Sequence, residues 1–231
     1  MFAKDIMTTA VVTVSEKASV DEAVKKMLDH HVSALPVVGD EDKLVGLISE
    51  GDLLRRLQDS DRPRRSWWLE LINSPETSAQ DYIRARSQRI SDVMTRDVIS
   101  VGEDTPVSEI AGMLEKRRIK RVPVLRDGNV VGIVSRANLV HALAAASDGR
   151  LPQPSASDAD LRKAVALAIE EVPGAAVNLI NFTVENGSVA VWGMADSDFV
   201  ENAVRVAVEN VPGVRHIDVH MGRLPSWGYG I

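Results

Sequence analysis

Two short segments combine a glycine, a hydroxyl and an acid or amide at one fixed spacing. The first is Gly46-Leu47-Ile48-Ser49-Glu50-Gly51-Asp52, and the second is Gly132-Ile133-Val134-Ser135-Arg136-Ala137-Asn138. In each, a predicted strand ends and a helix begins, so unpaired backbone N–H groups would face an anion. We expect the Ser49 hydroxyl to reach a phosphate and the Asp52 carboxylate to accept hydrogen bonds from both ribose hydroxyls.

The same spacing has a simpler interpretation that needs no ligand. Ser-x-x-Asp before an apolar run is also a helix capping box. In the second segment Asn138 keeps one carbonyl acceptor but lacks the charge of Asp52. We therefore expect its hold on a ribose to be weaker by about 1–2 kcal/mol. Both interpretations stay open, with Asp52 marking the stronger predicted ribose site and Ser135, Arg136 and Asn138 a weaker one.

These segments belong to an internal repeat, which shows how they would be positioned. Asp5-Ile6-Met7-Thr8 recurs as Asp92-Val93-Met94-Thr95, and Leu35-Pro36-Val37-Val38 recurs as Val122-Pro123-Val124-Leu125. Each copy predicts the order strand, helix, strand, strand, helix.

Local signals place the ends of these elements. Ser19 and Glu22 predict a capping box for a helix from Ser19 to about His30. In the second copy we expect Thr105 as the N-cap and Pro106 as the first helical residue. Short β-branched runs predict strands, and polar residues predict hairpin turns between them; the strands are Leu35 to Val38 and Leu44 to Ile48, and the turns are 40–42 and 127–129.

This repeat resembles the CBS motif, which occurs in pairs that pack into one module. The resemblance implies an α+β fold of two β-α-β-β-α motifs, a pair that dimerises, and an adenosyl ligand in the cleft between the motifs. It places motif one at 1–57, a helical insert at 58–89 and motif two at 90–146. The CBS pair therefore occupies 1–146.

The same resemblance assigns further site residues. Basic residues before the apolar-Pro pair touch nucleotide phosphates in the regulatory subunit of AMP-activated kinase, and Lys120 and Arg121 occupy those places here. Adenine is expected against main chain near Val12, Thr13, Leu35 and Pro36, or near the counterparts Val122 and Pro123. Nearby cations favour AMP, ADP or ATP over the sulfonium of S-adenosylmethionine.

After a predicted linker at 147–156, residues 157–223 predict a small α-β-β-α-β domain, followed by a tail at 224–231. Its predicted elements are a helix from Ser157, strands at Val177 to Val184 and Val189 to Trp192, a helix from Asp198 to Asn210 and a strand at Val214 to Met221. The order, with Asn186-Gly187-Ser188-Val189, Trp192-Gly193 and Val211-Pro212-Gly213-Val214, resembles the BON domain. BON domains are often proposed to contact phospholipid, but no basic and aromatic cluster here supports lipid contact.

The insert carries Trp67 and Trp68 beside several arginines, among them Arg64 and Arg65. We expect the tryptophans to pack on a core edge or a dimer interface, with a membrane anchor or a ligand contact through Arg64 and Arg65 as alternatives. His216 and His220 are spaced for one face of a strand, but no third ligand accompanies them, so no metal is expected.

Composition narrows the function classes. The chain of 231 residues has no cysteine and a net charge of -6, which disfavours disulfides, thiolate zinc sites and general nucleic-acid binding. No signal peptide or membrane span is evident, so a cytoplasmic location is expected. No phosphate loop or nucleophile with a nearby base is found, so we predict a non-catalytic homodimeric sensor of an adenine nucleotide that relays binding to an unknown partner. The alternative is a constitutive scaffold or membrane-surface adaptor without a nucleotide.

Overall fold

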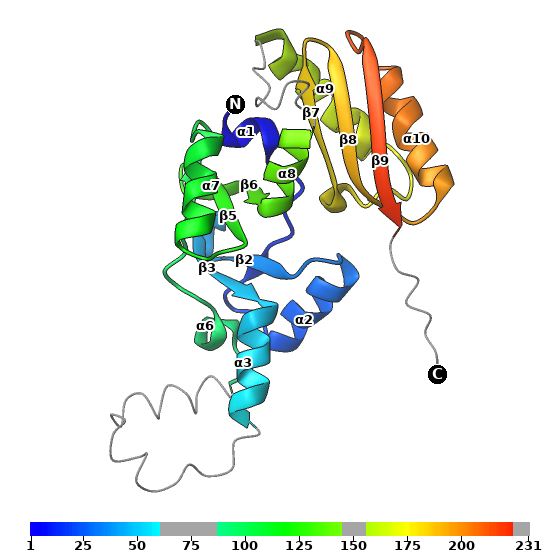
Figure 1. The fold of residues 1–231 in the computed structure, drawn as a ribbon. Helices are drawn as coiled ribbons and strands as arrows, with labels where there is room; N and C mark the ends of the chain where they lie inside the picture. Colours follow the sequence, from blue (N-terminus) through cyan, green and yellow to red (C-terminus); the bar gives the residue numbers. More distant parts are fainter. Residues whose placement is uncertain (61–86, 145–155, 224–231) are drawn as a thin grey trace, which may run out of the picture. The chain divides into compact units, whose positions relative to one another are not determined.

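The computed structural model describes residues 1–60, 87–144 and 156–223 (Figure 1). The chain divides into two compact units that do not follow the order of the repeat. One unit contains residues 12–99 and 127–130, and the other contains residues 1–11, 100–126 and 131–231. The predicted helix in the insert, with Arg64, Arg65, Trp67 and Trp68, lies outside the described residues.

The first unit is built on a three-stranded sheet in the order β1-β2-β3. Strand β1 runs parallel to β2, and β2 runs antiparallel to β3 with Leu35 opposite Ile48. Apolar side chains from this sheet and from α2 form its core, where Leu35, Ile48 and Ile90 are fully buried. Its described elements are β1 (Val14–Ser15), α2 (Val20–Asp29), β2 (Ala34–Val38), η1 (Asp40–Asp42), β3 (Leu44–Ser49), α3 (Glu50–Ser60) and α6 (Ile90–Val93).

The second copy repeats this arrangement in the other unit, with a sheet in the order β4-β5-β6. Ile6, Ile110, Val122 and Val134 are fully buried in it. The elements of this copy are β4 (Val101–Gly102), α7 (Val107–Lys116), β5 (Arg121–Arg126), β6 (Asn129–Ser135) and α8 (Arg136–Ala144), and the same unit includes α1 (Ala3–Ile6) from the start of the chain. The predicted mixture of helices and strands, and the similar arrangement of the two copies, are therefore confirmed.

The opening segment of each copy packs on the other copy's glycine. A Cβ atom on Gly132 would lie 2.2 Å from the Met7 sulfur, and one on Gly46 would lie 2.4 Å from the Met94 sulfur. Thr8 exchanges two backbone hydrogen bonds of 3.0 Å with Ile133, and Thr95 does the same with Leu47 at 2.9 Å. The recurrence of the methionine and the glycine in both copies therefore has one cause, because each glycine leaves room for a buried thioether.

Two Gly→Ala substitutions should change the free energy of unfolding in opposite directions, and together they test this packing. Gly132→Ala is expected to lower the free energy of unfolding by about 1–3 kcal/mol, because the added methyl overlaps buried Met7. Gly112→Ala in α7 meets no atom within 4 Å and should raise it by up to about 1 kcal/mol through helix propensity. Urea unfolding measures both, and an unchanged midpoint for Gly132→Ala would contradict the packing argument.

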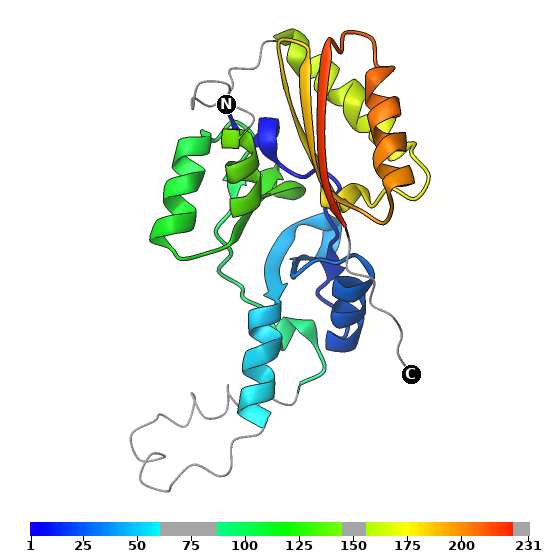
Figure 2. The same cartoon turned by 45° about the vertical axis from the view of Figure 1, so that its right-hand side comes forward.

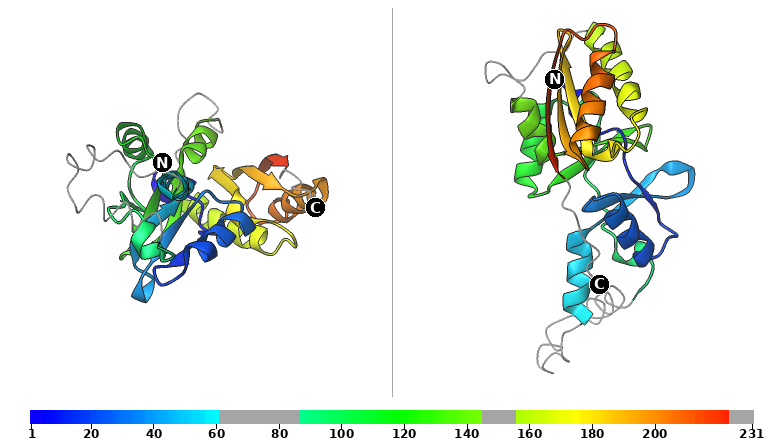
Figure 3. Two further views of the ribbon diagram at one scale, coloured as in Figure 1. Left: turned by 90° about the horizontal axis from the view of Figure 1, so that it is seen from below. Right: turned by 90° about the vertical axis from the view of Figure 1, so that its right-hand side faces the viewer.

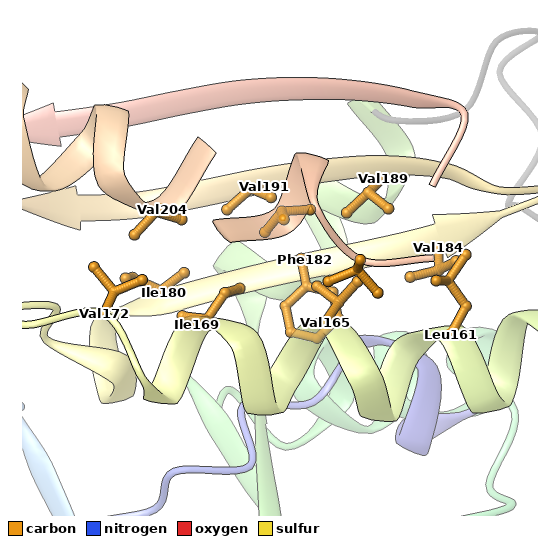
Figure 4. Packing of buried hydrophobic residues seen from close by; sticks show 12 residues of the cluster. Leu161, Val165, Ile169, Val172, Ile180, Phe182, Val184, Val189, Val191 and Val204 are labelled. Carbon is orange, nitrogen blue, oxygen red and sulfur yellow. The ribbon is translucent and has the colours of Figure 1, made fainter. Parts of the chain in front are cut away.

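The C-terminal domain has the predicted order of helix, two strands, helix and strand (Figures 1 and 3). Its sheet is ordered β7-β8-β9, with β8 antiparallel to β7 and parallel to β9. Helices α9 and α10 cover one face, and Figure 4 shows Leu161, Val165 and Ile169 of α9 pointing at β7. The elements are α9 (Ala156–Glu170), η2 (Val177–Leu179), β7 (Ile180–Glu185), β8 (Ser188–Ala195), α10 (Asp198–Glu209) and β9 (His216–Arg223).

The residues predicted to begin the helices were only partly correct. The Ser19 hydroxyl accepts a hydrogen bond from the Glu22 N–H at 3.1 Å, as predicted. In the second copy the prediction was wrong by one residue, because Pro106 takes the N-cap position and α7 begins at Val107. The Thr105 hydroxyl instead accepts from the Gly102 N–H at 3.1 Å, which uses it in the preceding turn.

Candidate ligand-binding site

The first candidate site is the turn from Ser49 to Asp52, where β3 ends and α3 begins. One carboxylate oxygen of Asp52, Oδ2, accepts from the Ser49 N–H at 2.9 Å and from the Ser49 hydroxyl at 2.7 Å. The Asp52 side chain is only 7% exposed. The Asp52 half of a capping box is therefore present, and these bonds hold the carboxylate in a fixed orientation.

The second oxygen of Asp52 has a partner that the sequence analysis missed. The Arg55 guanidinium, three residues along α3, pairs with Oδ1. The i,i+3 spacing on a helix is the signal that would have identified it. Arg55 is 68% exposed, so an incoming ribose would displace a solvated side chain at small cost.

Residues predicted to face adenine lie beside this turn in the same unit. Ala34 pairs with Ser49 across the sheet, which places Leu35 and Pro36 next to the turn. Val14 pairs with Val37, so Val12 and Thr13 precede that pair on the neighbouring strand. Leu35 and Pro36 are both buried, so the predicted contact of adenine with their main chain stays a prediction. The Thr13 carbonyl already accepts from Lys26 Nζ at 3.1 Å.

The second candidate site is the turn from Ser135 to Asn138, in the other unit. Asn138 Oδ1 accepts from the Ser135 N–H at 2.9 Å and from its hydroxyl at 2.6 Å, which reproduces the first turn. Asn138 Nδ2 then donates to the Ile6 carbonyl at 2.8 Å and to Asn181 Oδ1 at 3.1 Å. Within the described chain, both acceptor positions and both donors of this buried amide are thus in use.

This bonding gives the asparagine a role of its own. An aspartate at position 138 has no N–H to donate to the Ile6 carbonyl, whereas Asp52 faces an arginine instead. One copy has an asparagine and the other an aspartate because the first side chain faces a carbonyl and the second faces an arginine. The predicted ribose contact of Asn138 stays a prediction, and it requires Asn138 to exchange a partner.

The remaining predicted ligand residues lie around β5. Lys120 is exposed, and its carbonyl accepts from the Arg136 N–H at 3.2 Å. Arg121 opens β5 and is partly buried, while Val122 and Pro123 are buried. The Arg136 guanidinium donates to the Leu114 carbonyl at 3.3 Å in the last turn of α7. That placement favours helix capping for Arg136, because a cation is stabilised near a helix C-terminus.

The described side chains and helices bear on metal and membrane contact. In the described ranges, no cluster of three or more His, Cys, Asp or Glu side chains is arranged to hold a metal ion. His220 Nε2 instead lies 3.0 Å from Asp218 Oδ2 on the exposed side of β9. Over those same ranges, no helix combines the length and apolarity required to cross a bilayer.

Comparison with known proteins identifies similar chains. A family model described as CBS domain matches residues 3–59 and 90–145, so both matched segments end before the C-terminal domain. The protein MJ1426 of Methanocaldococcus jannaschii is 32% identical over 154 residues, which is 62% of this chain and 91% of that protein. The chloroplastic CBS domain-containing protein CBSX1 of Arabidopsis thaliana is 31% identical over 135 residues, covering 56% and 57% respectively.

One solved structure supports a comparison of the fold. The crystal structure of CBSX2 in complex with AMP has a TM-score of 0.54 and 28% sequence identity. The match covers 63% of this chain and 98% of that one. The similarity therefore spans nearly all of that protein and leaves more than a third of this chain beyond it.

Proposed function

Because the chain belongs to the family of CBS-domain proteins, we propose that it is a regulatory protein that binds an adenine nucleotide at the turn from Ser49 to Asp52. The observation that carries the proposal is the buried Asp52 carboxylate. Ser49 fixes one of its oxygens, and only an exposed arginine covers the other. The AMP named in the similar CBSX2 structure is a ligand of the matching chemistry.

In the proposed complex, each part of the nucleotide has its own partner in the protein. The ribose hydroxyls donate to the Asp52 carboxylate, and such charge-assisted bonds are about twice as strong as neutral ones. The adenine edge meets the main chain of β2 near Leu35 and Pro36. The predicted phosphate contacts Lys120 and Arg121 belong to the other unit, and their role stays a prediction from the sequence.

A regulatory role follows from this binding chemistry without a catalytic step. CBS-domain proteins are generally regulatory, and CBS domains also occur in enzymes as regulatory modules. In the proposed mechanism, the nucleotide shifts the chain toward the conformation that binds it more tightly, and the BON-like C-terminal domain presents that change to a partner. The shift is limited to the difference in affinity between the two conformations.

We further propose that two chains pair through the helices that follow the two turns. Leu54 on α3 is 59% exposed, and Val140 and Leu143 on α8 are 64% and 52% exposed. Exposed apolar side chains on the surface of a helix are typical of an interface between chains. The proposed unit is a homodimer.

Thermal unfolding against AMP, ADP, ATP, NAD and S-adenosylmethionine tests the nucleotide proposal. A ligand at a hundred times its dissociation constant adds about 2.7 kcal/mol to the free energy of unfolding. For a chain of this size, the midpoint should rise by several degrees with the correct ligand. Midpoints that do not move at millimolar concentrations of all five compounds would contradict the proposal.

The alternative function is a constitutive scaffold, and one observation favours it. Ser49 and Arg55 already satisfy the Asp52 carboxylate without a ligand, as expected for a capping residue. In that case the pair of CBS copies would hold a dimer, and the C-terminal domain would recruit a partner constitutively. The same set of unfolding measurements separates the two functions.

A further inference from the structure

The sheet of the C-terminal domain packs on its helices with one face and is also covered over part of its other face, at β7 and β8. Ile180, Phe182 and Val184 face its own helices. Thr183 lies on the opposite face of β7 and is only 3% exposed, and Trp192, opposite Asn181 on β8, is only 5% exposed. A sheet with a solvated outer face would expose such residues, so another element must cover them.

The covering elements are α1, from the N-terminal segment, and α8, from the second CBS copy. Helix α1 contacts both β7 and α8, and Figure 2 shows α1 and α8 beside the strands, away from α10. The Trp192 ring stacks on the His141 ring of α8, with centroids 4.9 Å apart and planes inclined by 18°. Burial lowers the pKa of His141, which favours the neutral ring and a stack with no charge to desolvate.

Polar contacts hold three consecutive residues of the N-terminal segment. The Ile6 carbonyl accepts from Asn138 Nδ2 at 2.8 Å, and the Met7 carbonyl accepts from Arg162 Nη2 at 3.3 Å. The Thr8 hydroxyl donates to Asn181 Oδ1 at 2.7 Å. Asn181 Oδ1 also accepts from Asn138 Nδ2, so one side chain of the C-terminal domain bridges the N-terminal segment and the turn.

Arg162 on α9 adds further contacts between the C-terminal domain and the N-terminal segment. Its guanidinium donates to the Phe182 carbonyl at 2.7 Å and lies 4.6 Å from the centre of the Phe182 ring. Burial lowers the pKa of Arg162 to about 10, which still leaves it charged at pH 7. A desolvated cation that is satisfied by two carbonyls has little tolerance for a displaced partner, so the contact is specific.

We infer that the turn from Ser135 to Asn138 is a docking surface for the chain's own C-terminal domain, which the hydrogen bonds of Asn181 hold there. The contacts carry this inference without reference to a nucleotide. Its functional consequence rests on the proposed function: the chain binds one nucleotide, at Asp52, and a second can use Asn138 only when Asn181 leaves. Nucleotide binding to the second copy would then be coupled to the position of the C-terminal domain, which is the domain proposed to contact a partner.

Thiol labelling tests the docking directly, because the chain contains no cysteine. Thr183→Cys places a single thiol on the buried outer face of the sheet without touching Asn181. In that background, Asn181→Ala should raise the labelling rate at least about tenfold, since the loss of this one partly buried acceptor leaves two donors without it. Asn202→Ala, an exposed asparagine on α10, is the matched control and should leave the rate unchanged. Equal rates for the two variants would overturn the inference.

Calorimetric titration of the full chain with AMP tests the consequence. One equivalent should bind to each wild-type chain, and Asp52→Asn should reduce that binding. Two equivalents bound to the wild-type chain would contradict the closed second turn. If AMP does not bind at all, the proposed function fails, and the labelling experiment decides the docking inference by itself.

Discussion

Asp52→Asn is expected to weaken AMP binding by about 5- to 30-fold, while the unfolding midpoint of the nucleotide-free protein stays close to that of wild type. The loss corresponds to about 1–2 kcal/mol, the difference between charged and neutral acceptors for the ribose hydroxyls. The cap should survive because Asn138 Oδ1 accepts the same two bonds from Ser135 in the second copy. Loss of the Arg55 pair should matter little, since Arg55 is largely exposed.

Asp52→Ala is the matched comparison for this substitution. It removes the acceptor for the Ser49 N–H as well as the charge, so it should also lower the free energy of unfolding by about 0.5–2 kcal/mol. Calorimetry and urea unfolding on both variants separate the two roles of the side chain. If Asp52→Asn binds AMP as tightly as wild type, Asp52 is only a capping residue.

Asn138→Asp is expected to lower the free energy of unfolding by about 2–4 kcal/mol at about pH 8. The new carboxylate would face the Ile6 carbonyl and Asn181 Oδ1 with no proton to donate to either. Both neighbours carry lone pairs, and the position is only 3% exposed. The expected loss is therefore larger than for the reverse substitution at Asp52.

The pH dependence of this variant supplies an independent check. Burial and facing oxygen atoms should raise the pKa of the new carboxyl in the folded state above its unfolded value. The folded state then binds more protons, so stability falls as the pH rises through that range. Urea unfolding at about pH 5 should thus show a smaller deficit relative to wild type than at about pH 8. A deficit that does not change with pH would point to a steric cause.

Local chemistry predicted much of this fold. The Asn186-Gly187 and Asp127-Gly128 turns both have the positive φ angles required by two-residue hairpins, and short β-branched runs flank them. Here the deciding interactions lie within a few residues along the chain. Thr105 shows the limit of such signals. Its hydroxyl could cap α7 or accept from Gly102 in the preceding turn, and it does the latter.

The candidate site was only partly predictable for a physical reason. The Ser49–Asp52 contact spans three residues and follows from the spacing, but its hydrogen bonds are those of a cap whether or not a ribose binds. The partners of Asn138 lie 132 and 43 residues away in the chain. No periodicity or composition encodes such a pairing, so the sequence shows a weakened acceptor where the structure shows a donor.

The exchange of opening segments between the copies also constrains how the chain acquires its structure. Residues 1–11 belong to a unit whose other parts begin at residue 100, so this segment has no complete partner while the first repeat is synthesised. At about 5–20 residues per second, translation would delay that partner by roughly 5–20 s. Such a high contact order predicts slow folding, with Met7 and Ile6 exposed to aggregation or chaperones until the second repeat leaves the ribosome.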